Sequence, residues 1–164
     1  RVVPVDEYLP KLRAALAARG AAPFHVTART DALAAEGVDS AIERAQAFAA
    51  AGADAVFVEA PESAEQMAMI RAAVPASVPL VANMVEGGRT PLRPAAELAA
   101  AGYAIVVVPI AGLLSSAHAL DAAYASLRRD GITTAAADRM VPFDEMNTLL
   151  GLEECYRRER DWLT

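Results

Sequence analysis

The chain has 164 residues, of which 55% are hydrophobic, so it can bury a substantial core and is not an intrinsically disordered protein. Its formal net charge of -6 and its scattered arginines argue against a nucleic-acid partner, and no apolar run approaches the roughly 20 residues that a membrane helix requires. The single cysteine, Cys155, excludes an intrachain disulfide and favours a reducing, cytoplasmic location.

The chain alternates helical and strand patterns from its beginning to Arg129. Apolar residues recur at helical spacing from Tyr8 to Leu16, and Gly20 ends that run. The segment after Pro23 is short and β-rich, which predicts a buried strand. In chain order we then predict a strand over 24–28, a loop over 29–39, a helix over 40–51, a strand over 55–58, a helix over 63–74, a strand over 79–82, a loop over 84–91, a helix over 94–101, a strand over 105–108 and a helix over 113–129.

Four strands that alternate with helices are typical of repeated βα units around a parallel sheet. No G-x-G-x-x-G fingerprint and no P-loop follows a predicted strand, which favours a (β/α) barrel over a doubly wound nucleotide-binding sheet. A complete (β/α)8 TIM barrel has eight strands in roughly 250 residues. We therefore expect residues 1–131 to supply the carboxyl-terminal half of such a barrel, about four βα units.

Residues 132–164 are expected to form a separate helical extension. Residues 131–137 are mostly small and suit a hinge, whereas residues 152–163 read as a charged amphipathic helix that carries Tyr156 and Trp162. A barrel with eight helices has no place for these apolar side chains. We therefore expect the extension to be swapped between subunits across a symmetric dimer, the alternative being a helix folded over its own barrel.

Polar residues follow the predicted strands at their carboxyl ends. If the last residue of each strand faces the barrel interior, Arg29, Glu59, Asn83 and Pro109 share one mouth, where parallel sheets bind their ligands. Two interpretations of Arg29 and Glu59 stay open: they neutralise each other, or they bind a ligand, and both can hold at once. Asp31, two residues after Arg29, is a candidate for the same site, but a loop carboxylate or a local helix cap is the favoured interpretation.

Four sequence runs carry a family resemblance. They are ARTDA at 28–32, GADAVFVEA at 52–60, ANMVEGGRTP at 82–91 and DRM at 138–140. In this order and spacing they resemble the isocitrate lyase and phosphoenolpyruvate mutase superfamily, and most closely its 2-methylisocitrate lyase branch. The resemblance implies a (β/α)8 barrel, dependence on Mg²⁺, 2-oxo acid or enolate chemistry at the barrel mouth, and a homotetramer of helix-swapped dimers.

The resemblance also implies roles for single residues. Arg29 would bind the substrate carboxylate, Glu59 would hydrogen-bond within the cluster of 2-oxo acid and metal, and Asn83 would orient a carboxylate. The other implied substrate-binding residues are Gly87, Gly88 and Thr90 in the loop after the third strand, and Pro109 after the fourth. The Mg²⁺ ligands and the mobile catalytic loop of the family belong to earlier strands, so we expect no metal ligand in this chain.

The leading functional hypothesis is a Mg²⁺-dependent carbon–carbon lyase that cleaves a small 2-hydroxy di- or tricarboxylate, such as 2-methylisocitrate or isocitrate, to a 2-oxo acid and a carboxylate. Glu59 favours this hypothesis, because the resemblance implies a histidine there in the phosphonate-forming branch. An oxaloacetate decarboxylase, a phosphonopyruvate- or phosphoenolpyruvate-mutase-type enzyme, and an inactive barrel used as a scaffold are the alternatives. The expected partners are the substrate, the amino-terminal half of the same protein and further copies of it.

The two histidines are not assigned to catalysis. His25 lies at the amino-terminal end of the first predicted strand, away from the predicted mouth, so we interpret it as a residue of the barrel core or bottom layer. His118 lies within the helix predicted over 113–129, without a carboxylate at a suggestive spacing, and we interpret it as a packing or surface residue.

Overall fold

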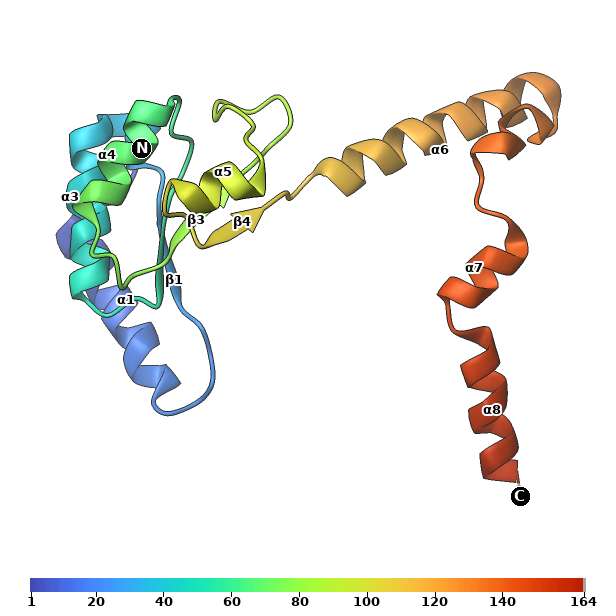
Figure 1. Cartoon of the computed structure of the whole chain (residues 1–164), viewed down its shortest axis with the longest axis horizontal. Helices are drawn as coiled ribbons and strands as arrows, with labels where there is room; N and C mark the ends of the chain where they lie inside the picture. Colours follow the sequence, from blue (N-terminus) through green and yellow to red (C-terminus); the bar gives the residue numbers. More distant parts are fainter. Residues whose placement is uncertain (164) are drawn as a thin grey trace. The chain divides into compact units, whose positions relative to one another are not determined.

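The protein, described over residues 1–163 by a computed structural model, consists of two compact units, Arg1–Ala111 and a second that starts at Gly112 (Figure 1). The first unit contains α1 (Val5–Arg19), β1 (Thr27–Thr30), α2 (Ala32–Glu36), α3 (Val38–Ala50), β2 (Ala55–Val58), α4 (Ala64–Ala73), β3 (Leu80–Asn83), α5 (Ala95–Ala100) and β4 (Ile105–Val107). This alternation confirms the predicted α/β class.

The sheet contains four parallel strands in the order β1-β2-β3-β4, so each strand lies beside its neighbour in the sequence (Figure 1). Pairing of Thr27 with Ala55 and of Val81 with Ile105 sets the register. Within the described residues, β1 pairs only with β2, and β4 pairs only with β3. Both outer edges of the sheet are therefore open, as expected for half of a barrel.

The hydrophobic core lies between one face of the sheet and the helices. Alternate strand residues such as Ala28 and Val56 are fully buried there, and they pack with Phe48 of α3, Ile70 of α4 and Leu98 of α5. Because side chains alternate along a strand, the residues between them point to the opposite face of the sheet. That second face carries the predicted functional residues.

Two of the predicted helix ends have clear local causes. Ser63 precedes α4, its hydroxyl accepts a hydrogen bond from the Gln66 amide at 3.2 Å, and Gln66 Oε1 accepts one from the Glu62 amide at 2.7 Å. Together these two hydrogen bonds cap the amino-terminal end of α4. Gly52, which follows α3, adopts a φ of 92°, a conformation that glycine accepts without strain.

The first strand starts later than predicted. Residues 24–28 were expected to form it, but β1 spans Thr27–Thr30, and Phe24 is 69% exposed. The ladder begins where Thr27 lies opposite Ala55. Before that pair the Asp54 amide still donates to the Val26 carbonyl at 3.0 Å, but the Val26 amide donates to the Asp54 carboxylate at 2.7 Å and not to a backbone carbonyl, so the regular pairing stops there. The predicted loop over 29–39 is also wrong in part, because α2 and the start of α3 lie within it.

The second unit contains α6 (Ala111–Asp130), the 3₁₀ helix η1 (Thr134–Arg139), α7 (Phe143–Leu149) and α8 (Leu152–Leu163). The boundary between the two compact units lies at the start of α6, between Ala111 and Gly112, and the division of the chain after residue 131 stays a prediction. Thr164, the last residue of the extension predicted over 132–164, lies outside the described residues. Within residues 1–163, no helix is both long and apolar enough to cross a membrane.

Candidate active site

Arg29 and Glu59 meet at the carboxyl ends of two neighbouring strands. Arg29 lies on the exposed face of β1, and Glu59 directly follows β2, where its amide donates a hydrogen bond to the Thr30 carbonyl at 2.9 Å. Arg29 Nη2 lies 3.0 Å from Glu59 Oε2. The mutual neutralisation left open by the sequence therefore occurs.

Asn83, the last residue of β3, extends this cluster to a third strand. Its Nδ2 donates to Glu59 Oε1 at 3.3 Å and more weakly to Oε2 at 3.5 Å. Asn83 Oδ1 is buried and has no hydrogen-bond partner among residues 1–163. A buried carbonyl oxygen without a donor is costly, so this atom is a ready acceptor for a ligand or a water molecule.

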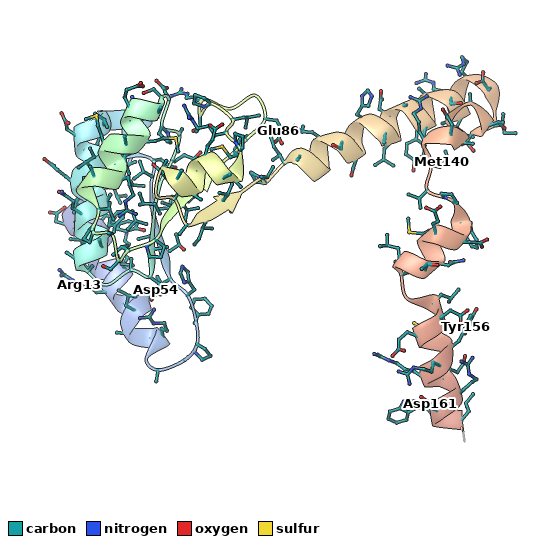
Figure 2. The ribbon with its side chains drawn as sticks, in the orientation of Figure 1. Arg13, Asp54, Glu86, Met140, Tyr156 and Asp161 are labelled. Atoms are coloured by element: carbon teal, nitrogen blue, oxygen red, sulfur yellow. The ribbon has the colours of Figure 1, made fainter. Side chains whose placement is uncertain are left out.

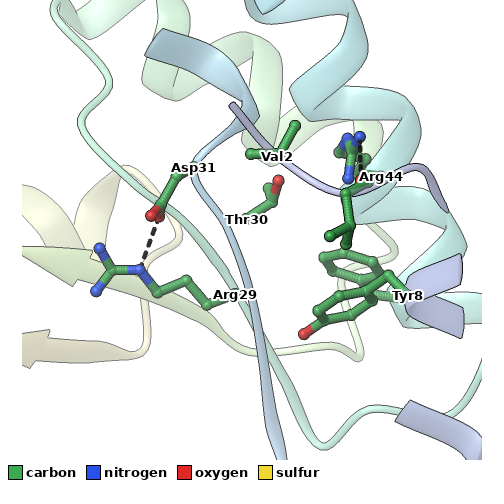
Figure 3. Close-up of a pocket in the computed structure, with 8 residues that line it drawn as sticks. Val2, Tyr8, Arg29, Thr30, Asp31 and Arg44 are labelled. Carbon is green, nitrogen blue, oxygen red and sulfur yellow. Dashed lines mark hydrogen bonds and ion pairs between the residues drawn. The ribbon is translucent and has the colours of Figure 1, made fainter. Parts of the chain in front are cut away.

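Arg29 is also held by two residues on its other sides. Its Nε donates to Asp31 Oδ1 at 2.8 Å, the contact drawn as a dashed line in Figure 3, and its Cζ lies 4.9 Å from the centroid of the Phe57 ring. The hydrogen bond to Asp31 raises the pKa of the Arg29 guanidinium, and the nearby Glu59 carboxylate acts in the same direction. No contact within the described chain engages Nη1, so the guanidinium keeps N–H donors for an anion.

The residue after Glu59 has an unusual backbone conformation. Ala60 has a φ of 57°, the one positive φ of a non-glycine residue within residues 1–163. Such a conformation costs on the order of 1 kcal/mol for alanine and tends to occur at functional sites. Sequence reasoning missed this feature, because an alanine gives no signal that its backbone is left-handed.

The other predicted binding residues lie in loops at the same ends of the strands. Gly87 has a φ of 73°, and the Gly88 amide closes the turn on the Val85 carbonyl at 2.9 Å. Thr90, farther along this loop, is buried, whereas Pro109 after β4 is exposed. None of these four residues has a hydrogen bond or ion pair to Arg29, Glu59 or Asn83 within the described residues, so their roles stay predictions.

A cavity of about 280 Å³ lies beside the open edge of β1 (Figure 3). Arg29 and Asp31 line one side, and the rings of Tyr8 and Phe48 line another. The buried Arg44 also contributes, and its Nη2 donates to the Val3 carbonyl at 2.9 Å. The cavity thus adjoins the candidate site at the strand edge that has no neighbour in this chain.

The carboxylates of this chain do not form a metal site by themselves. No group of three or more histidine, cysteine, aspartate or glutamate side chains within residues 1–163 could hold a metal ion. The two carboxylates of the cluster, Asp31 and Glu59, both contact the Arg29 guanidinium.

The two histidines make no hydrogen bond or ion pair with Arg29, Glu59 or Asn83 within the described residues. His25 is exposed in the described part of the chain and, with Asp54, lines a cavity before the first strand, and its interpretation as a residue of the barrel core or bottom layer stays a prediction. His118 lies on α6, in the second unit, and lines an apolar cavity of about 300 Å³ there.

Parallel βα units with an arginine, a glutamate and an asparagine at the carboxyl ends of three successive strands are the arrangement of a (β/α)-barrel protein. The sequence profile described as phosphoenolpyruvate phosphomutase matches residues 1–128. The chain therefore belongs to the phosphoenolpyruvate mutase family of the isocitrate lyase superfamily, and its sheet and helices are part of that barrel fold.

Two curated relatives give the extent of the match. The chain is 40% identical to a 2,3-dimethylmalate lyase of Eubacterium barkeri over 99% of its own length and 56% of the relative. It is 38% identical to a 2-methylisocitrate lyase of Escherichia coli K12 over 88% of this chain and 48% of that one. The chain thus spans about half the length of these relatives.

Solved structures agree with this assignment. Oxaloacetate acetylhydrolase in complex with the product oxalate superposes with a TM-score of 0.89 at 33% identity, covering 100% of this chain and 56% of the other. A phosphonopyruvate hydrolase complex with oxalate and Mg²⁺ gives a TM-score of 0.84 at 29% identity, covering 99% and 58%. The family therefore contains lyases and hydrolases, and at least one member has been crystallised with Mg²⁺.

Proposed function

We propose that the full-length protein is a carbon–carbon lyase that cleaves a small 2-hydroxy di- or tricarboxylate to a 2-oxo acid and a second carboxylate. The observation that carries this proposal is the cluster of Arg29, Glu59 and Asn83 at one edge of the sheet. The similarity of the chain to lyases of 2,3-dimethylmalate and 2-methylisocitrate supports the reaction class.

The cluster suits a carboxylate substrate because the Arg29 guanidinium still has N–H donors to offer and Asn83 Oδ1 can still accept a hydrogen bond. Arg29 Nη1 is available to donate to a carboxylate oxygen, while Glu59 and Phe57 hold the guanidinium. The buried Asn83 Oδ1 can accept a hydrogen bond from a hydroxyl or a water molecule at the reacting centre. Arg29 and Asn83 thus bind and orient the substrate, and Glu59 keeps both in place.

In the proposed reaction a base removes the proton of the substrate hydroxyl, the hydroxyl-bearing carbon becomes a carbonyl, and the adjacent carbon–carbon bond breaks. The bonding electrons remain on the released fragment as an enolate-like carboxylate, which is then protonated, and the other fragment becomes the 2-oxo acid. We assign binding and orientation to this chain. Proton transfer and Mg²⁺ binding are assigned to the rest of the full-length protein, because the described residues supply no set of metal ligands. Mg²⁺ dependence is supported by the phosphonopyruvate hydrolase complex.

We further propose that the rest of the protein closes the barrel along the free edges of β1 and β4. Those edges leave backbone groups of β1 and β4 without a strand partner within the described residues. For the second unit, we propose exchange of helices between subunits within a tetramer. The large exposed side chains of α7 and α8 support this proposal; Figure 2 labels Tyr156 of α8, and the most exposed are Phe143, Leu149, Trp162 and Leu163.

The experiment is a substrate panel on the full-length enzyme with and without Mg²⁺. The panel contains 2,3-dimethylmalate, 2-methylisocitrate, isocitrate, oxaloacetate and phosphonopyruvate, and the readout is release of a 2-oxo acid. We expect turnover of at least one hydroxy acid and its loss on chelation of Mg²⁺. Activity on oxaloacetate alone would favour an oxaloacetate decarboxylase, and activity on phosphonopyruvate alone would favour a phosphonopyruvate-type enzyme. A protein that neither turns over nor binds any of these compounds would favour an inactive scaffold.

A further inference from the structure

We propose that Asp31 is a positioning residue that orients the Arg29 guanidinium for substrate, a role that rests on the proposed function of the Arg29 cluster. Asp31 lies two residues after Arg29, and its Oδ1 accepts a hydrogen bond from Arg29 Nε at 2.8 Å. Figure 3 shows the two side chains pointing toward each other at the end of β1. Asp31 therefore acts through Arg29 and not on the substrate.

The contacts of Arg29 are divided among its nitrogen atoms. Asp31 engages Nε, Glu59 engages Nη2 at 3.0 Å, and the Phe57 ring lies beneath Cζ. A guanidinium is planar, so fixing Nε and Nη2 also fixes the direction in which the Nη1 donors point. Arginine otherwise has considerable rotamer freedom, and holding it before the substrate arrives reduces the entropy lost on binding.

A purely structural role for Asp31 does not agree with its surroundings. The side chain is 57% exposed, and exposed ion pairs contribute little to stability. Asp31 occupies the position before α2, yet its side chain makes no capping hydrogen bond to that helix. The helix-cap interpretation is therefore wrong, whereas the alternative interpretation as a loop carboxylate agrees with the exposed position of Asp31 between β1 and α2. The contact with Arg29 is the one hydrogen bond that the Asp31 carboxylate makes within the described residues.

The test uses the full-length protein and three variants. Asp31→Ala removes the acceptor, Asp31→Asn keeps an oxygen opposite Arg29 Nε but removes the charge, and Glu97→Ala is the matched control. Glu97 is also 57% exposed and pairs with an arginine, Arg93, at 3.4 Å, but it lies on α5. The probes are oxalate in Mg²⁺ buffer by calorimetry, kcat and KM on the accepted substrate, and thermal unfolding.

We expect Asp31→Ala to weaken oxalate binding and to raise KM, each by about tenfold, with an unchanged melting temperature. Asp31→Asn should recover oxalate affinity to within about threefold of the wild type, because the hydrogen bond to Nε is kept. Glu97→Ala should match the wild type in every measurement. Equal oxalate affinity and KM in Asp31→Ala and Glu97→Ala would overturn the proposal, as would a fall in melting temperature that accounts for the loss.

A separate readout keeps this proposal independent of the overall function. Phenylglyoxal attacks neutral guanidine groups, so loss of the Asp31 carboxylate should speed modification of Arg29, measured by peptide mass spectrometry. We expect a rate at least about threefold faster in Asp31→Ala and no change in Glu97→Ala. An unchanged rate would show that the contact does not restrain Arg29. A wild-type protein that binds no oxalate and turns over no substrate would instead refute the proposed function, whatever the modification rate.

Discussion

The guanidinium of Arg29 lies over the ring of Phe57, its partner in the β1–β2 ladder, with 4.9 Å between Cζ and the ring centroid. The two residues face the same side of the sheet because they are directly paired in register. Phe57 thus forms a platform for the cation, and the strand alignment determines where Arg29 can reach.

Replacing Phe57 by leucine should weaken the site without unfolding the protein. Leucine keeps an apolar side chain on β2 but removes the cation–π interaction, which is worth about 0.5 to 1 kcal/mol at an exposed site. Oxalate affinity of the full-length enzyme should therefore fall by about two- to fivefold. An affinity equal to that of the wild type in a calorimetric titration would show that the ring plays no part in holding Arg29.

Ala60→Gly should raise stability. Ala60 holds a φ of 57°, and glycine adopts this region without the steric cost that alanine incurs. The gain should be up to about 1 kcal/mol, reduced in part by the greater freedom of glycine in the unfolded chain. Urea unfolding of the full-length protein measures it, and the control Gly52→Ala, at a φ of 92°, should change stability in the opposite direction. A loss of stability in Ala60→Gly would show that the left-handed backbone at this position carries no strain.

Asp54→Asn should lower stability at neutral pH and have little effect in acid. The Asp54 carboxylate accepts from the Val26 amide at 2.7 Å and pairs with Arg19, and these contacts lower its pKa, the backbone hydrogen bond contributing most. A depressed pKa in the folded state means that the stabilisation is present above the unfolded value of about 4 and is lost as pH falls through the folded value. Unfolding curves at about pH 7 and about pH 2 should therefore differ between wild type and variant only at the higher pH. An equal difference at both pH values would show that the charge of Asp54 is not what stabilises the fold.

Removal of the residues from Thr133 onward should reduce the size of the full-length oligomer. The exposed apolar side chains of α7 and α8 are proposed to pack on another subunit, so the truncated protein loses that contact. Light scattering should give a smaller species with a tendency to aggregate. The same mass and melting temperature as the intact protein would instead indicate that these helices pack within their own subunit.

The sequence predicted those parts of the fold that depend on short-range patterns. The strand over 55–58 was bounded correctly, because Gly52 ends the helix before it and the polar Glu59 follows it. The start of β1 was wrong, because only the partner strand decides where a ladder begins. The helix α2 was missed because five residues are too few to show a helical period.

The candidate site, like the fold, could be predicted from the sequence only in part. Strand alternation and the family motifs indicated Arg29, Glu59 and Asn83, and the structure brings these three together. The contact of Asp31 with Arg29 and the left-handed Ala60 were not predicted, because both depend on the path of the backbone after the strand ends. Such details of side-chain contact and backbone conformation can be seen only in the three-dimensional structure.

The central claim, that Arg29 binds the substrate carboxylate, is tested most directly by titrating oxalate into full-length wild type and Arg29→Lys in Mg²⁺ buffer. Lysine keeps the charge but loses the planar donors and the contact to Asp31 through Nε. We predict that the lysine variant keeps its melting temperature and binds oxalate about 100-fold more weakly, roughly 3 kcal/mol. Equal affinity in the two proteins, or a large fall in melting temperature with unchanged affinity, would contradict the account.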